Sequence, residues 1–329
     1  MKKKIKVIVT GGAGFIGSHL VSKLVEKNFE VCVIDNLSTG RIENLEHIKK
    51  KIKFYKYDLS SKGSWVKIFD KRVKYVFHLA AIADIVPSIE NPEKYFKANV
   101  LSTLNILHEC RKNKCKIIYA ASSSCYGIPK KFPTNEKSEV SPQYPYAFSK
   151  HAAENLILHW SKVYKIKFIS LRLFNVYGTR SRTSGTYGAM FGVFLSQKLH
   201  KVPLTIVGNG RQSRDFVYVS DVVEAFYKAA VNKNYNLILN VGSSKPISIL
   251  KIANILKHKF VFIPDRPGEP KKTYANINLI KRKLQWKPKI KIEDGIAKML
   301  KDINYWKNAP VWKKKNIQQA TKSWFKFLK

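Results

Sequence analysis

Near its start the chain carries Ile5-Lys6-Val7-Ile8-Val9-Thr10-Gly11-Gly12-Ala13-Gly14-Phe15-Ile16-Gly17, an apolar run of strand length that leads into regularly spaced glycines. Gly11 permits a tight turn, Gly14 lets the backbone approach a pyrophosphate, and Gly17 allows a helix to pack closely on the strand. A helical pattern follows, so a diphosphate would lie over a helix N-terminus, where free N–H groups and the dipole favour an anion. The stretch therefore predicts a strand, a dinucleotide-binding turn and a helix.

Acidic residues follow the next two predicted strands. Asp35 comes 18 residues after Gly17, and a carboxylate at this position accepts hydrogen bonds from the adenosine ribose and repels a 2′-phosphate. This favours NAD over NADP, although Arg41 nearby could hold a 2′-phosphate. Asp58 closes the third strand, where its carboxylate could accept from the adenine amino group or simply form a turn.

Strand-length apolar runs alternate with helical stretches through the first half of the chain. The predicted strands are 5–10, 31–35, 52–57, 75–79, 117–121 and 168–173, and the predicted helices are 19–26, 65–69, 92–111 and 146–162. Such alternation predicts βαβ units, and nearly continuous apolar strands are typical of parallel sheets covered on both faces. The predicted fold class is therefore α/β, with a Rossmann-type doubly wound parallel sheet and a smaller, discontinuous α/β domain for substrate.

Glycine and proline become frequent after about residue 175, and the predicted elements become shorter. We expect residues 1–174 to form the dinucleotide-binding domain. Residues 215–240 should pack back on it, because 220–230 has the pattern of a long apolar helix. Residues 175–214 and 241–329 would form the second domain, whose final Lys-rich helical stretch, 293–329, is broken near Pro310.

Hydroxyl groups and a lysine mark a candidate catalytic centre. Tyr146 and Lys150 are four residues apart in a predicted helix, which places them on one face. A tyrosine hydroxyl has a pKa of ~10, so a Tyr146 base needs a lowered pKa, which a nearby ammonium and an oxidised nicotinamide would supply. Ser122, Ser123 and Ser124 follow the fifth strand, at the sheet edge where ligands bind in such folds.

The chain resembles the NAD-dependent nucleotide-sugar epimerase/dehydratase branch of the extended short-chain dehydrogenase/reductase family. The motifs that carry the resemblance are residues 10–20, Asp35-Asn36-Leu37-Ser38-Thr39-Gly40, Asp58-Leu59, His78-Leu79-Ala80-Ala81, Asn99, 122–127, 146–150, 171–178, 208–219 and Arg266-Pro267-Gly268-Glu269.

The resemblance implies a role for each matching residue. It implies that Tyr146 is the catalytic base, Ser122 its partner, and Lys150 the group that holds the nicotinamide ribose and lowers the tyrosine pKa. The NAD site would comprise Gly11, Gly14, Phe15, Ile16, Gly17, Asp35, Asn36, Ser38, Asp58, Leu59, Ala80, Ala81, Asn99, Tyr146, Lys150 and Phe174. Substrate would contact Ser123, Ser124, Asn175, Arg214, Arg266 and Glu269, the two arginines gripping the diphosphate unless they form surface ion pairs.

The resemblance also favours one reaction, epimerisation at C4 of a nucleotide-diphosphate sugar through a transient 4-keto intermediate. Family members that dehydrate carry an Asp-Glu pair at the positions of Ser123 and Ser124, and decarboxylating members usually carry Glu at the second. Dehydration, decarboxylation and 4-keto reduction are therefore weaker alternatives, and a non-catalytic NAD-binding protein is weaker still. UDP-glucose or UDP-galactose is the default substrate. Thr273, expected near the sugar C2, would leave room for an N-acetyl group and so for UDP-N-acetylglucosamine.

The composition constrains the partners. The 329 residues carry a net charge of +39, which suits nucleic acid, but 51 of the 61 basic residues are lysines scattered along the chain. We therefore expect anionic small molecules, and no nucleic-acid or membrane partner, because no apolar run reaches the ~20 residues of a membrane span. Four cysteines without metal-ligand spacing predict reduced thiols, no metal and a cytoplasmic protein. The resemblance implies a homodimer through the helices 92–111 and 146–162.

Overall fold

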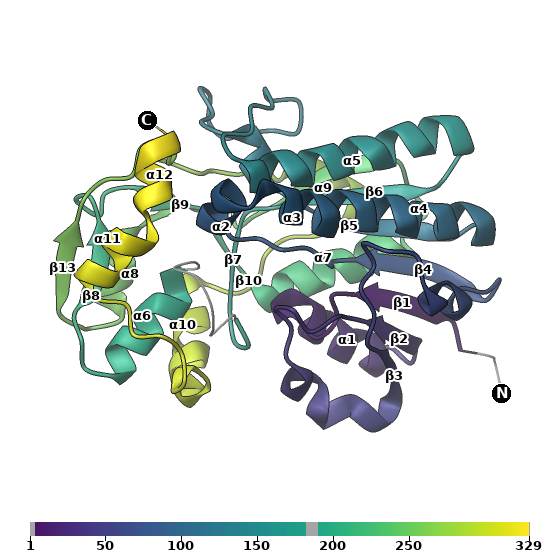
Figure 1. Cartoon of the computed structure of the whole chain (residues 1–329), viewed down its shortest axis with the longest axis horizontal. Coiled ribbons are helices and arrows are strands. Elements are labelled where there is room, and N and C mark those ends of the chain that lie inside the picture. The colour runs from purple at the N-terminus through teal and green to yellow at the C-terminus, as the bar shows by residue number, and fades with distance from the viewer. Residues whose placement is uncertain (1–3, 182–189, 329) are drawn as a thin grey trace.

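The computed structural model describes residues 4–181 and 190–328 (Figure 1). Its strands are β1 (Lys6–Thr10), β2 (Glu30–Ile34), β3 (Ile52–Tyr55), β4 (Val73–His78), β5 (Lys116–Ser122), β6 (Phe168–Leu173), β7 (Asn175–Tyr177), β8 (Leu204–Val207), β9 (Ser213–Arg214), β10 (Phe216–Tyr218), β11 (Leu237–Val241), β12 (Ile247–Ser248) and β13 (Phe260–Ile263).

Helices occupy most of the remaining described chain. The α-helices are α1 (Phe15–Glu26), α2 (Ile85–Glu90), α3 (Pro92–Phe96), α4 (Ser102–Asn113), α5 (Pro145–Tyr164), α6 (Met190–Leu199), α7 (Val219–Val231), α8 (Ile249–Ile255), α9 (Asn278–Leu284), α10 (Ile292–Lys301), α11 (Lys314–Ala320) and α12 (Lys322–Phe327). Shorter or irregular helices are η1 (Ile42–Lys51), η2 (Ser64–Ile68), η3 (Lys97–Leu101), η4 (Ser123–Tyr126) and η5 (Ile303–Trp306).

A seven-stranded parallel sheet forms the centre, with strand order β11-β6-β5-β4-β1-β2-β3. Alternate strand residues enter two different cores, as the pleat requires. On one face Val7 and Val9 of β1 pack with α1 and α7, and on the other Ile8 packs with α4 and α5 (Figure 1). The expected fold class, a doubly wound α/β sheet, is confirmed.

Several predicted boundaries shift. The helix predicted at 92–111 is one helical stretch containing a wider π-type turn, η3, between α3 and α4. The first helix begins at Phe15 rather than residue 19, directly after the glycine turn. The predicted break near Pro310 is confirmed, because α10 ends at Lys301 and α11 begins at Lys314.

Small separate sheets lie beyond the carboxyl ends of the central strands. They pair β7 with β10, β9 with β12, and β8 with β13. The edge strand β11 belongs to the central sheet although it follows these strands in the sequence. We propose that the small sheets and the C-terminal helices form the second domain with the boundaries given above, of which residues 182–189 lie outside the described part.

In the described part of the chain, no helix combines the length and the apolar character that crossing a membrane requires.

Candidate active site

The glycine turn after β1 borders a cavity of about 640 Å³. Gly11 has a φ of +68°, and a Cβ there would lie 2.7 Å from the backbone nitrogen of Ala80. A Cβ on Gly17 would lie 2.1 Å from the carbonyl oxygen of Gly11. Both positions therefore require glycine, and the turn has the close helix–strand approach that the sequence predicts.

Asp35 lies at the end of β2, buried beneath this turn. Its carboxylate accepts hydrogen bonds from the backbone N–H groups of Ala13 (2.9 Å) and Leu37 (2.8 Å). Burial raises the pKa of this carboxyl group, and the two N–H groups offset the rise. Asp35 thus holds the turn in shape as well as lining the cavity.

Most residues predicted to contact a dinucleotide line this one cavity. They are Gly11, Gly14, Phe15, Ile16, Gly17, Asp35, Asn36, Ser38, Asp58, Leu59, Ala80 and Ala81. Asn99, Tyr146, Lys150 and Phe174 are not among the described residues that line it. Asn99 instead bonds to both backbone groups of Ile82 (2.9 and 3.1 Å) and to the hydroxyl of Ser149 (2.9 Å), so it ties the helices to the loop after β4. Phe174 packs against the ring of Tyr126.

Tyr146 and Ser122 come together as predicted. Tyr146 is half-buried in the first turn of α5, and Ser122 ends β5. The Ser122 hydroxyl forms a hydrogen bond with the Tyr146 phenol. This hydrogen bond lowers the pKa of Tyr146 and so favours the phenolate. Burial nevertheless raises the pKa of Tyr146 above its ordinary value, so the chain by itself does not supply the lowered pKa of a base.

Lys150 lies one turn along α5 and is buried. Its Nζ is 4.2 Å from the ring centroid of Tyr119, and burial lowers the pKa of its ammonium group to about 7. The negative charge of Glu154, one further turn along the helix, raises the pKa of Lys150 and so opposes the effect of burial. The helix thus carries Tyr146, Lys150 and Glu154 at successive turns of one face, as the four-residue spacing predicts.

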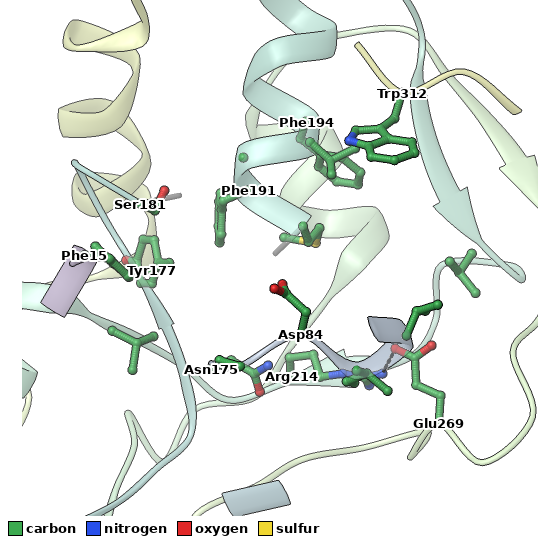
Figure 2. A pocket seen from close by; sticks show the side chains of 18 of the residues that line it. Phe15, Asp84, Asn175, Tyr177, Ser181, Phe191, Phe194, Arg214, Glu269 and Trp312 are labelled. Carbon is green, nitrogen blue, oxygen red and sulfur yellow. Dashed lines mark hydrogen bonds and ion pairs between the residues drawn. The ribbon is translucent and has the colours of Figure 1, made fainter. Parts of the chain in front are cut away.

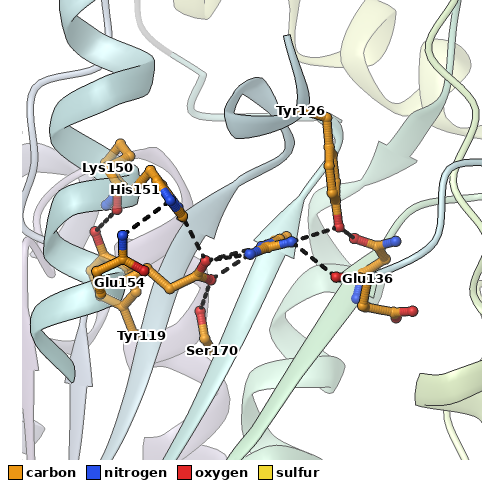
Figure 3. A network of polar contacts seen from close by, with 10 residues as sticks. Tyr119, Tyr126, Glu136, Lys150, His151, Glu154 and Ser170 are labelled. Atoms are coloured by element: carbon orange, nitrogen blue, oxygen red, sulfur yellow. Dashed lines mark hydrogen bonds and ion pairs between the residues drawn. The ribbon is translucent and has the colours of Figure 1, made fainter. Parts of the chain in front are cut away.

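A buried polar network anchors this part of α5 to the sheet (Figure 3). Arg172 on β6 makes a bidentate ion pair with Glu154, with Nη2 2.6 Å from Oε2 and Nε 3.3 Å from Oε1. Arg172 also donates to the Tyr126 hydroxyl (3.0 Å), which donates to Asn240 on β11 (2.7 Å). Because a bidentate pair fixes direction as well as distance, the network holds α5 in register with β6 and, through Tyr126 of η4, with β11.

A second cavity, of about 510 Å³, adjoins the first, sharing Gly14, Phe15, Thr39, Ala81 and Ala83 with it (Figure 2). The predicted substrate residues Ser124, Asn175, Arg214, Arg266 and Glu269 line it, together with Tyr146. Ser123 is not among the described lining residues. Tyr146 therefore lines the second cavity, which adjoins the dinucleotide-sized one.

The two arginines are not exposed surface pairs. Arg214 is buried and its Nη2 lies 2.7 Å from Oε1 of Glu269, while Arg266 Nη1 lies 3.9 Å from Oε2 of the same residue.

Thr273 was expected near the sugar C2, but it is not among the described residues that line the cavity. Its hydroxyl donates to Oδ1 of Asn175 (3.0 Å) and accepts from the backbone N–H of Asp215 (2.9 Å), so it orients Asn175 instead.

Several lining residues were not predicted from the sequence. Asp84 after β4 and Trp312 and Trp324 in the C-terminal segment lie at this cavity. Trp324 on α12 donates its indole N–H to the carbonyl of Pro267 (2.6 Å), and the Arg266 guanidinium lies over its ring. No local pattern marks these residues, because each reaches the cavity through tertiary packing.

A parallel α/β fold with a glycine turn at one cavity and a tyrosine that lines an adjoining cavity is typical of dinucleotide-binding enzymes. The NAD dependent epimerase/dehydratase family matches residues 7–242, and the chain is an enzyme of this family.

Relatives in this family differ in activity. The chain is 39% identical over 310 residues to a Methanocaldococcus jannaschii protein named "Putative UDP-glucose 4-epimerase", covering 92% of this chain and 98% of that one. It is 32% identical to UDP-glucuronic acid decarboxylase 1 of Arabidopsis thaliana, covering 92% and 70%. A solved UDP-glucuronic acid 4-epimerase from Bacillus cereus, in complex with UDP-glucuronic acid and NAD, has a TM-score of 0.84 at 30% identity, covering 92% and 99%.

Proposed function

We propose that this protein uses NAD to epimerise C4 of a nucleotide-diphosphate sugar through a transient 4-keto intermediate. The observation that carries the proposal is the hydrogen-bonded Tyr146–Ser122 pair, with Tyr146 lining the second of two adjoining cavities. The name of the 39% identical relative supports the same assignment.

The first cavity fits a dinucleotide. Its glycine turn leaves no room for a Cβ at Gly11 or Gly17, so a pyrophosphate could approach the backbone and the N-terminus of α1. Asp35, Asn36, Ser38 and Asp58 would face the adenosine, and Tyr146 and Lys150 the nicotinamide ribose. Bound here, NAD would supply reversible hydride transfer, so the reaction needs no external redox partner.

Tyr146 would take the proton from the sugar 4-hydroxyl, with Ser122 relaying it and stabilising the phenolate by its hydrogen bond. Because burial raises the pKa of Tyr146, the positive charges of Lys150 and of an oxidised nicotinamide must offset that rise. Arg214 and Arg266 would hold the diphosphate while the 4-keto sugar turns in the cavity. Tyr146 would then return the proton to the oxygen on C4.

Decarboxylation is the main alternative, since a decarboxylase is among the relatives. That reaction and dehydration would lack the carboxylate expected after Ser122, because Ser123 and Ser124 occupy those positions. A serine hydroxyl does not act as a general acid or base near neutral pH without a partner of suitable pKa. The same argument favours epimerisation over both.

The test is a panel of nucleotide sugars incubated with the wild-type protein, with C4 epimers and any lost carbon dioxide resolved. Tyr146→Phe should lower kcat by roughly 10²–10⁴-fold, because it removes the proton acceptor. Tyr164→Phe, on an exposed tyrosine of the same helix, is the matched control and should leave kcat unchanged. Full turnover by Tyr146→Phe would show that the base is misassigned.

Homodimer formation through the helices at 92–111 and 146–162, and a cytoplasmic location, stay predictions. The proposed substrate pair is UDP-glucose and UDP-galactose.

A further inference from the structure

Tyr144 directly precedes α5, at a position where its side chain does nothing for the helix itself. It is the N-cap residue, and its side chain makes no capping hydrogen bond. Serine, threonine, aspartate and asparagine are preferred at such positions, because their side chains accept hydrogen bonds from the first free N–H groups of the helix. The half-buried tyrosine found here therefore does not serve the helix end, and its contacts lie in the active site instead.

The hydroxyl of Tyr144 is connected to both active-site serines. It forms a hydrogen bond with the hydroxyl of Ser124, which lines the substrate cavity. Burial raises the pKa of Tyr144 to about 12, so at neutral pH the phenol stays protonated and acts as the donor in this bond. The backbone N–H of Ser124 in turn donates to Oγ of Ser122 (3.2 Å). Because Oγ of Ser122 already accepts from this N–H, the Ser122 hydroxyl is directed as a donor to Tyr146.

The ring of Tyr144 also contacts the proposed base directly. The rings of Tyr144 and Tyr146 are stacked, with centroids 6.3 Å apart and 10° between their planes. The Trp324 ring lies against Tyr144 as well, with centroids 6.4 Å apart. Alternate residues at the start of α5 thus face alternate residues at the end of β5. A displacement of Tyr144 would move Tyr146 through the stacked rings and Ser122 through Ser124.

We propose that Tyr144 is a positioning residue for the Tyr146–Ser122 pair, which it holds through the Ser124 hydroxyl and through the stacked phenol ring. This inference rests on the proposed function and deepens it. Tyr144 is not among the described residues that line the substrate cavity, so it acts through the residues it contacts.

A positioning role predicts a loss of kcat without a loss of ligand affinity. The diphosphate is assigned to Arg214 and Arg266, whose contacts with Glu269 do not involve the Tyr144 hydroxyl. A role limited to holding the cavity together would instead weaken ligand binding and kcat in parallel.

The experiment measures kcat on UDP-glucose, or on the sugar that the panel above identifies, together with the dissociation constant of UDP and the NAD content. Tyr144→Phe removes the hydroxyl but keeps the ring, and should lower kcat roughly tenfold, as expected for one hydrogen bond. Tyr144→Leu removes both contacts and should lower kcat roughly 100-fold, because small displacements of catalytic groups are costly. The affinity for UDP and the NAD content should match the wild type in both variants. Tyr164→Phe, at an exposed position of the same helix, is the control and should change none of these quantities.

Ser124→Ala tests the route by which the hydroxyl acts. This variant keeps the backbone N–H that donates to Ser122 but removes the group that the Tyr144 hydroxyl holds. Effects of independent residues multiply, whereas effects along one route do not. In the Ser124→Ala background, Tyr144→Phe should therefore lower kcat by less than twofold.

The outcomes separate this inference from the proposed function. Wild-type kcat in Tyr144→Phe, or parallel losses of kcat and UDP affinity, would overturn the role of Tyr144 while the proposed function stands. A full tenfold loss in the Ser124→Ala background would overturn it as well. If the wild-type protein epimerises no sugar of the panel, the proposed function fails and this inference fails with it.

Discussion

The two cavities are built in different ways. The residues lining the cofactor cavity all fall between Gly11 and Ala120, at the ends of consecutive strands and the starts of the helices that follow them. The residues lining the substrate cavity extend from Gly14 to Trp324 and come from short strands, loops and the C-terminal helices. The first site depends on local backbone geometry, whereas the second depends on how distant segments pack. Mutations should therefore affect the two sites separately.

The largest effect is expected at the glycine turn. In Gly17→Ala the new Cβ would meet backbone atoms of Gly11 and Gly12, which cannot move without opening the turn. We expect a loss of roughly 1–3 kcal/mol in the free energy of unfolding and little NAD released when the purified protein is denatured. Denaturant titration and absorbance of the released cofactor measure these effects.

Gly63→Ala is the control for that change. Gly63 is extended, with a φ of −174°, and the nearest atom to an added Cβ is on the Trp65 side chain at 3.5 Å. It should retain wild-type stability and cofactor content. Normal NAD content in Gly17→Ala would mean that the cofactor is not held by this turn.

A smaller, selective effect is expected from Trp324→Ala. Removing the buried ring opens the substrate cavity beside Arg266. We expect the lost apolar contact to weaken binding of the nucleotide sugar by about 2 kcal/mol, which corresponds to a ~30-fold increase in KM. The NAD content should not change, because Trp324 does not line the cofactor cavity. Steady-state kinetics combined with cofactor release would distinguish the two sites, and an equal loss of both would contradict their independence.

Phe327→Ala is the control on the same helix. Its side chain is 61% exposed, and the substitution should change neither the KM nor the NAD content.

The smallest effect concerns pH. His78 is buried below the cofactor cavity, with Nδ1 2.8 Å from the Thr10 hydroxyl and Nε2 3.0 Å from that of Thr103, and burial lowers its pKa to about 3. Between pH 6.5 and 3 the unfolded chain therefore binds a proton at His78 that the folded chain does not. The free energy of unfolding should decrease on acidification by at most ~1.4 kcal/mol per pH unit from this residue.

The measurement is denaturant unfolding at pH 7 and pH 5. The difference between the two pH values should be smaller in His78→Asn than in wild type, whatever the absolute stability of the variant. His159→Asn, at an exposed position, is the control. If His78→Asn loses as much free energy of unfolding between pH 7 and pH 5 as the wild type, groups other than His78 cause the acid sensitivity.

The contrast between the cavities also explains what the sequence could predict. The glycine spacing and strand-end residues such as Asp35 and Ser122 could be assigned to the binding edge of the sheet from the sequence alone. This is possible because the carboxyl ends of parallel strands all lie at one edge. Asn99 shows the limit of such reasoning, since it was predicted to contact the cofactor, but its side chain bonds to Ile82 and Ser149 and is not among the described residues that line the cavity. Asp84 and Trp324 carry no local signal, because their places at the substrate cavity come from packing between segments far apart in the chain. The pKa of Tyr146 could not be predicted either, since burial, which depends on tertiary structure, outweighs the local helix spacing.

The C-terminal tryptophan has a consequence for the order of events during protein synthesis. Every described lining residue of the cofactor cavity has been translated by residue 120, and the Tyr146–Lys150 turn follows soon after, but the wall at Trp324 is complete only when residue 324 has been made. A nascent chain therefore contains all residues of the nucleotide-binding groove while the sugar pocket is still open on one side.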